Sequence, residues 1–145
     1  MERWKPVLGY EGLYSASDMG RVRSEERTIN REEGWDGRKG GRVHYPERIL
    51  STKRKDSARH ELCGLQKDKK KTVYDVHRLV YEAHVRPLEK GEVVHHKNDA
   101  KWDNRLDNLI AMGDAEHKSH HQQAINQKCE LADFLTLCWI IKGAT

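Results

Sequence analysis

The stretch VVHHKNDAKWDNRLDNLIAMGDAEHKSHH, residues 93–121, concentrates imidazole side chains that folding alone hardly requires. His95 and His96 end a short β-rich run, and His117 and His121 stand four residues apart. Imidazole is the commonest metal ligand, and its charge changes near neutral pH. Side chains at i and i+4 leave the same face of a helix. We therefore expect a strand, a polar loop and a helix that bring imidazoles together around a single divalent cation.

The histidines can take different roles at such a centre. Three ligands, His95, His117 and His121, would leave open positions on the cation, which marks catalysis more than structure. His96 follows His95, so in a strand it points to the opposite side and could take a proton from water. His120, at i+3 from His117, is an alternative helix ligand that geometry alone does not exclude. Exposed histidines on a polar helix would explain any one of these residues, but hardly all of them at this spacing.

The segments before this stretch alternate between short extended runs and turns. Residues 14–17 and 21–24 flank an Asp-Met-Gly turn and predict a β-hairpin. Residues 25–46 hold several glycines and few apolar side chains, so we expect a long loop or insertion there. Residues 47–76 resume the apolar runs and predict strands of a small antiparallel sheet, with residues 68–71 as a charged turn.

Helical apolar spacing is found on both sides of the histidine-rich stretch. One helix begins near Asp75, carries an apolar stripe and ends before Pro87. A second helix, capped by Asp114, would carry His117. Residues 131–141 are the most apolar part of the chain and fit an amphipathic helix. That last helix either docks on the body of the protein or forms a dimer contact.

Composition indicates one domain, or one domain with a small appendage. The 145 residues include 34% charged side chains and have a mean hydropathy of −0.96, so the core is modest. Four Trp and five Tyr argue against outright disorder. The three cysteines form no C-x-x-C pair, which disfavours a cysteine zinc site and a disulfide framework and favours a reducing cytosol. No run approaches the ~18 apolar residues of a membrane span, and the N-terminus lacks the apolar core of a signal peptide.

Basic side chains are clustered rather than scattered, although the net charge is only +4. Clustered Lys and Arg are typical of proteins that bind the phosphate backbone of nucleic acids. From charge alone, a solvated basic surface is the alternative. The clusters are Arg21, Arg23 and Arg27, then Lys53 to Lys55, then Lys67 to Lys71 interrupted by Asp68.

Short motifs in both halves of the chain resemble known families. VHRLV at 76–80, HHKND at 95–99, DNRLDNL at 103–109 and EH at 116–117 together resemble the HNH endonuclease family, in particular its phage and homing-type branch. WKPV, GYEGLY and GRVRS, within residues 3–24, are similar to NUMOD4, a motif that often precedes that nuclease domain. Two separate motifs in the expected order make the resemblance strong.

The resemblance implies a ββα-metal fold, in which a two-stranded ribbon and a helix clasp one divalent cation. It implies that His96 is the general base and that Asn108 ties the loop between the strands and so positions His96. It also implies that His95 is the first metal ligand, His117 the last, and that His121 completes a pair of ligands on the helix.

Two positions depart from the family pattern, and a third matches it in a role that stays open. His95 stands where many relatives carry Asp, and a site with three imidazoles suits Zn, Ni, Co or Mn better than Mg, which prefers oxygen ligands. The cofactor is therefore one divalent ion, with Mg, Mn, Zn and Ni all open. Ala16 replaces a larger apolar residue of the N-terminal motif. His77 matches a recurrent residue of the preceding helix, where it either packs or contacts the DNA backbone.

These features predict an α+β fold. It consists of a small antiparallel sheet in the N-terminal region, a ββα-metal nuclease module and a C-terminal helix. The expected divisions are a NUMOD4-like motif at 1–24, an insertion and small β region that contacts DNA at 25–71, the nuclease module at 72–125 and the C-terminal helix at 126–145.

The predicted activity is metal-dependent hydrolysis of phosphodiester bonds in double-stranded DNA, by nicking or by cutting both strands. Rival interpretations are a DNA-binding module with a purely structural metal site and a histidine-rich metal-binding protein, although the basic clusters count against the second. We expect no membrane partner, and a homodimer only if the C-terminal helix pairs. The expected location is the cytoplasm of a bacterial host, with the gene carried by a phage or mobile element. The residues predicted to bind DNA are Arg21, Arg23, Lys53, Arg54, Lys55, Lys69, Lys70, His77 and Arg78.

Overall fold

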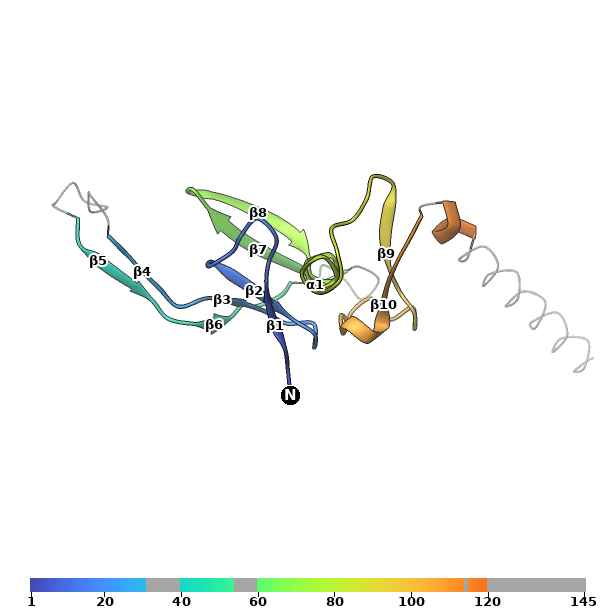
Figure 1. Ribbon diagram of the computed structural model, residues 1–145, viewed down its shortest axis with the longest axis horizontal. Helices are drawn as coiled ribbons and strands as arrows, with labels where there is room; N and C mark the ends of the chain where they lie inside the picture. Colours follow the sequence, from blue (N-terminus) through green and yellow to red (C-terminus); the bar gives the residue numbers. More distant parts are fainter. Residues whose placement is uncertain (31–39, 54–59, 114, 120–145) are drawn as a thin grey trace, which may run out of the picture.

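A computed structural model describes residues 1–30, 40–53, 60–113 and 115–119. Within these ranges the strands form one four-stranded sheet and three two-stranded sheets, all antiparallel, together with a nine-residue α-helix and a short helical segment at residues 115–119. This is the α+β class that the sequence predicts. The sheets are strung along an elongated body, with the helix near its middle (Figure 1).

The N-terminal sheet has the strand order β1-β2-β3-β6. Its strands are β1 (Trp4–Pro6), β2 (Tyr14–Ser17), β3 (Val22–Ser24) and β6 (Arg48–Ile49). The hairpin predicted around residues 18–20 is confirmed, because Ala16 pairs with Val22. Gly20 adopts a φ of 85° in its turn, a conformation that side chains with a Cβ rarely adopt.

The loop expected over residues 25–46 is in part a β-ribbon, so that prediction was wrong for its two ends. Strand β4 (Arg27–Asn30) pairs with β5 (Arg42–Tyr45), with Ile29 opposite Val43. The physical reason is that β-branched and aromatic residues fit a pleated ribbon even when the segment is too polar to be buried. Figure 1 shows this ribbon projecting from one end of the molecule.

A second hairpin joins β7 (Leu62–Lys67) to β8 (Lys70–Asp75). Its two turn residues, Asp68 and Lys69, have φ values of 50° and 62°. Positive φ at both central residues is the geometry of a type I′ turn, which matches the twist of a two-stranded ribbon. The charged turn predicted at residues 68–71 is therefore confirmed at residues 68–69, whereas Lys70 and Lys71 already belong to β8.

Helix α1 (Val76–His84) follows β8 directly, with Asp75 at its N-cap position. It begins and ends where the sequence predicts, because the chain leaves the helix at Val85, shortly before Pro87. Five of its residues are buried, and they lie on more than one side of the helix axis: Val76, His77, Leu79, Val80 and Tyr81.

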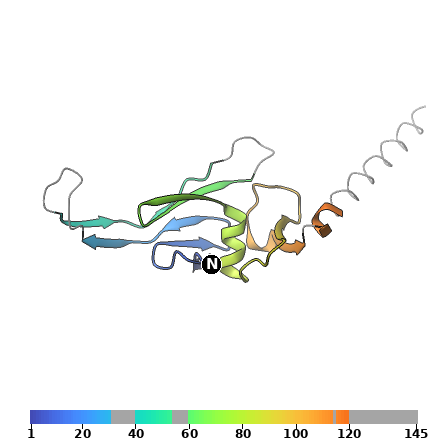
Figure 2. The same ribbon diagram turned by 90° about the horizontal axis from the view of Figure 1, so that it is seen from above.

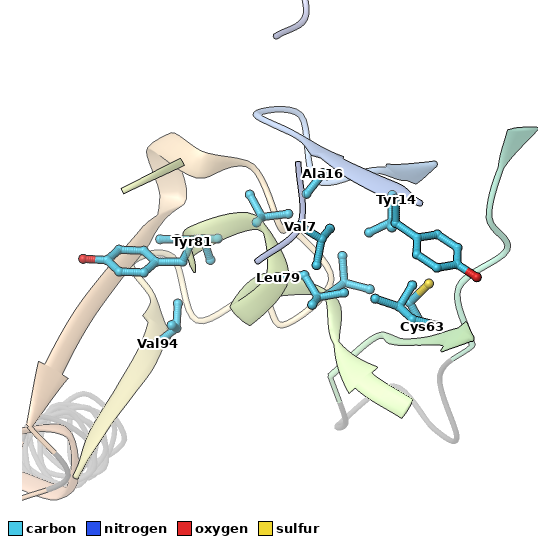
Figure 3. Close-up of a cluster of buried hydrophobic side chains, with 12 residues drawn as sticks. Val7, Tyr14, Ala16, Cys63, Leu79, Tyr81 and Val94 are labelled. Carbon is cyan, nitrogen blue, oxygen red and sulfur yellow. The ribbon is translucent and has the colours of Figure 1, made fainter. Parts of the chain in front are cut away.

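The hydrophobic core is built around α1 and draws on both halves of the chain. Figure 3 shows Tyr81 and Val94 on one side of the helix and Val7, Ala16 and Cys63 on the other. Because the same helix covers side chains from residues 7–22 and from residues 63–109, the N-terminal sheet and the later elements share one core.

The C-terminal described part holds β9 (Glu92–His96), the 3-10 turn η1 (Leu106–Asn108), β10 (Leu109–Gly113) and a helical turn at residues 115–119. Strands β9 and β10 pair with His95 opposite Ile110 and His96 opposite Leu109. In Figure 2 these elements lie on one side of α1, and the ribbon of β4 and β5 lies on the opposite side. Asp114 as a helix cap and the helix predicted over residues 131–141 lie outside the described residues. No helix among the described residues is long and apolar enough to cross a membrane.

Candidate active site

A cavity of about 260 Å³ lies where β9, the start of α1 and the helical turn at 115–119 meet. The strand contributes two adjacent imidazoles to its wall, and the helix N-terminus contributes one more. The lining residues are His60, Asp75, His77, Arg78, Val93, Val94, His95, His96, Asp99, Lys101 and His117. The cavity therefore gathers histidines that are up to 57 positions apart in the sequence, counting from His60 to His117.

His95 faces His117, as predicted for two ligands of one cation. The ring centroids are 5.2 Å apart and the planes are inclined at 72°. His95 is buried, and its Nε2 lies 4.0 Å from Oδ1 of Asp99 in the following loop. The predicted third ligand His121 and the alternative His120 lie outside the described residues.

His96 is also buried, and its ring is held by a chain of two hydrogen bonds. Its Nε2 lies 3.1 Å from Oδ1 of Asn104, which is also buried. Nδ2 of Asn104 in turn donates to Oε2 of Glu61 at 3.1 Å. A carboxylate only accepts hydrogen bonds, so this contact fixes the orientation of the Asn104 amide. The amide oxygen then accepts from Nε2 of His96, which leaves the lone pair on Nδ1.

Asn108 ties the loop between β9 and β10, and it does so through the loop backbone and the Asn98 side chain rather than through a hydrogen bond to His96. Its Nδ2 donates to Oδ1 of Asn98 at 2.9 Å and to the carbonyl of Asp103 at 2.8 Å. Its Oδ1 accepts from the Asn98 N–H at 3.1 Å. The carbonyl of His96 accepts from the Asp99 N–H at 2.9 Å, so the tied loop reaches His96.

A second group of side chains on the cavity wall was missed by the sequence analysis, namely His60, Asp75 and His77. One potential ligand atom from each lies within 4.8 Å of the others. The ring of His77 is 4.4 Å from that of His60 and 5.0 Å from that of His96, between centroids. No spacing rule could have found this group, because His60 precedes β7 and meets the helix only when the β7–β8 hairpin folds back.

Burial determines the charge of these imidazoles. It lowers the pKa of His77 to about 3, with further lowering from the nearby His60, His96 and Arg78. Burial also lowers the pKa of His60, against a smaller opposing effect of Asp75. Both pKa shifts favour the neutral ring, the form in which imidazole ligates metals.

The residues predicted to bind DNA differ in exposure and in their partners. Lys53, Lys69, Lys70 and Arg78 are exposed, and Arg78 also lines the cavity. Two other residues already have anionic partners. Arg21 pairs with Glu2. Arg23 pairs with Glu25 and with Glu47, and the nitrogen–oxygen distance is 3.1 Å in both of these pairs.

The remaining DNA-binding predictions differ in status. Arg54 and Lys55 lie outside the described residues. His77 is only 3% exposed and lies against His60 and His96. Of its two expected roles, packing agrees with this burial, whereas a contact with an exposed DNA backbone does not.

Two family models match parts of this chain, and a solved structure has a similar fold. Residues 74–119 match the family model described as HNH endonuclease, and residues 2–59 match that of the NUMOD4 motif. None of the curated proteins compared with the chain matches it. A solved structure described as "DNA binding and cleavage by the HNH homing endonuclease I-HmuI" has a similar fold, with a TM-score of 0.63 and 24% sequence identity. The similarity covers 90% of this chain and 66% of that one, so this chain spans about two thirds of its length.

Proposed function

The chain carries an HNH endonuclease module behind a NUMOD4 motif, and from this premise we propose that it hydrolyses phosphodiester bonds of double-stranded DNA with one divalent cation. The observation that carries the proposal is that two adjacent histidines have different partners. His95 faces His117, whereas His96 is held by Asn104, and all three imidazoles line one cavity. A ligand and a base need this separation, because a metal-bound imidazole has no lone pair left to accept a proton.

The donor atoms fit a cation. His95 and His117 would hold it, with His121 as the predicted third ligand, and imidazole donors favour Zn, Ni, Co or Mn over Mg. When bound, the ion would stabilise the negative charge that develops on the phosphate and on the leaving oxygen.

His96 is the proposed general base. The hydrogen bond from its Nε2 to Asn104 leaves Nδ1 as the acceptor for a proton of water. The oxygen of that water forms a bond to phosphorus while the bond to the 3′ oxygen breaks in line with it. The departing 3′ oxygen then takes up a proton from solvent, so that the products are a 5′ phosphate and a 3′ hydroxyl.

Basic side chains near the cavity support a polyanionic substrate. Arg78 and Lys101 line the cavity itself, where they would contact the phosphates next to the scissile one. The exposed Lys53, Lys69 and Lys70 would extend the contact along the backbone.

The test is nicking of supercoiled plasmid with Mn²⁺, Mg²⁺ or Zn²⁺, with and without EDTA. We expect His96→Ala to lower the nicking rate by about 10²- to 10⁴-fold, the usual contribution of a general base. The variant should still bind the cation in a calorimetric titration, since His96 is not a proposed ligand. His84→Gln is the matched control, because His84 sits on α1 with its Nε2 3.0 Å from the Ala16 carbonyl and does not line the cavity.

Two outcomes would contradict the proposal. Full activity of His96→Ala would remove His96 as the base. Plasmid that stays supercoiled with every cation, while a gel shift detects salt-dependent binding, would favour a DNA-binding module with a structural metal.

A further inference from the structure

His60, Asp75 and His77 come from three different segments and converge beside His96. His60 precedes β7, Asp75 ends β8 and His77 belongs to the first turn of α1. The ring of His60 stacks on that of His96, with centroids 5.5 Å apart and planes inclined at 23°. The group is thus next to the proposed base, whereas His95 on the same strand faces His117 instead.

The donor set is suited to a zinc-class cation. Two imidazoles and one carboxylate form a common three-ligand set, with bonds of about 2.0–2.2 Å and tetrahedral geometry, which places ligand atoms about 3.3 Å apart. The ligand atoms of this group lie within 4.8 Å of one another. Small rotations of the partly exposed His60 and Asp75 side chains would close that difference.

A second observation points to a missing ligand at this place. Nδ1 of His77 is buried and has no hydrogen-bond partner among the described residues. Buried polar atoms are nearly always paired, because their desolvation is costly when they are not. Nor does packing alone explain three imidazoles in mutual contact beside an aspartate.

We propose that His60, Asp75 and His77 bind a second divalent cation of the zinc class, in addition to the ion assigned to His95 and His117. This cation would join the segment before β7 to the end of β8 and the start of α1. It would therefore act as a structural clamp behind His96, and its binding would stabilise the folded chain by mass action. The proposal goes beyond nuclease activity and does not depend on it.

The experiment counts bound ions on the full-length chain. Protein stripped with a chelator and dialysed would be titrated with Zn²⁺ by calorimetry and with Co²⁺ by visible absorbance. We expect two equivalents in the wild type. His60→Ala and Asp75→Asn should each weaken one of the two sites by at least about 100-fold, since losing even an outer-shell partner costs about 10- to 100-fold.

The variants are chosen so that they keep the fold. The side chains of His60 and Asp75 are 39% and 36% exposed, and Asp75 makes no side-chain cap hydrogen bond to α1. His117→Ala should weaken the other site and leave this one unchanged. The control is His44→Ala, a histidine that is 55% exposed on the distant β5 and should keep both sites.

A thermal readout completes the test. Zn²⁺ should raise the Tm of the wild type and of His117→Ala, and it should raise the Tm of His60→Ala and Asp75→Asn clearly less. Unchanged titrations of His60→Ala and Asp75→Asn relative to His44→Ala, or a single equivalent in the wild type that only His117→Ala removes, would overturn the proposal. A chain that binds two ions but never nicks plasmid would refute the nuclease and leave this site standing.

Discussion

At the scale of the residue, the chemistry of the site depends on which nitrogen of His96 is protonated. Neither His96 nor Asn104 determines this alone, because an amide can present its oxygen or its nitrogen. Glu61 removes the ambiguity, since its carboxylate accepts from the amide nitrogen. Glu61 and Asn104 are therefore positioning residues for His96. Asn104 lies in the loop between β9 and β10, and Glu61 lies just before β7.

This arrangement predicts a specific defect in Asn104→Ala. We expect the kcat for nicking to fall by about 10- to 100-fold, a part of the contribution of the base, while KM for DNA and cation affinity stay close to wild type. ¹⁵N NMR of the His96 ring should report a mixture of tautomers in the variant. Glu61→Gln keeps an acceptor for Asn104, so it should retain most activity. A matched loss of kcat and Tm in both variants would point to a purely structural role instead.

At the scale of the element, the turn between β2 and β3 packs closely against the loop that carries Asn104. A Cβ built on Gly20 would lie 2.9 Å from the backbone carbon of Asn104, whereas one on Gly9 would meet nothing within 4 Å. Both glycines have positive φ, of 85° and 76°. The Asp18 carbonyl also accepts from the Leu106 N–H at 2.9 Å. The N-terminal motif thus supports the loop of the proposed active site directly.

This pair of glycines provides a controlled comparison. Gly9→Ala should cost about 1–2 kcal/mol of unfolding free energy, the usual penalty for a Cβ at positive φ. Gly20→Ala should cost about 1–3 kcal/mol more, because it also overpacks the Asn104 loop. Urea unfolding of both variants measures the difference. Equal losses would mean that the turn and the loop adapt to each other without strain.

The connection between α1 and β9 is another element with a measurable signature. Arg86 binds both carboxylate oxygens of Glu92 at 2.7 Å, and the Glu89 N–H donates to the same group. These contacts lower the pKa of Glu92 to about 2 from an ordinary 4.5. The stabilisation is therefore present above pH 4.5 and is lost as the pH falls towards 2.

NMR titration of the Glu92 carboxyl carbon measures this value directly. In Arg86→Ala we expect the pKa of Glu92 to return towards its ordinary range, and acid unfolding to begin at a higher pH. Because the pair is at the surface, the effect on stability at pH 7 should be small. A Glu92 carboxyl that titrates normally in the wild type would contradict this contact.

At the scale of the whole molecule, one core serves both halves of the chain. Ala16 and Val22 from the N-terminal sheet, with Val7 just after β1, pack in the same cluster as Val80 of α1 and Leu65 of β7. The chain should therefore unfold as a unit, rather than as an N-terminal motif and a separate nuclease module.

Two positions on the β7–β8 hairpin test this cooperativity. Leu65 is fully buried, so Leu65→Ala should cost about 2–5 kcal/mol. Val73 is 58% exposed on the same hairpin, so Val73→Ala should cost little. In Leu65→Ala, probes in the N-terminal sheet and in β9 should melt at the same temperature. Separate transitions would mean that the two halves are independent domains.

Local patterns in the sequence were sufficient for most elements. The hairpin at residues 14–24, the charged turn before β8, helix α1 and strand β9 follow from turn residues, apolar spacing and proline, all of which act over a few residues. The ribbon of β4 and β5 was not predicted. Its side chains are mostly polar and give no clear apolar pattern, and its two strands are separated in the sequence by residues 31–39. The resemblance to the HNH endonuclease family and to the NUMOD4 motif was predicted from short motifs, and it is confirmed by the family models, which match residues 74–119 and 2–59.

The sequence by itself indicated that His95 and His96 are adjacent on a strand and that His117 follows on a helix, because the β-rich run and the helical signals that predict these elements act over a few residues. Their roles as ligands and base stay predictions, as do those of Asn108 and His121. Only the tertiary structure decided that His60, Glu61 and Asp75 meet this group, and that Asn104 orients His96. These contacts join segments up to 43 residues apart, from Glu61 to Asn104. Such contacts form when a shared core draws α1, the β7–β8 hairpin and the β9–β10 loop together, and no local pattern encodes them.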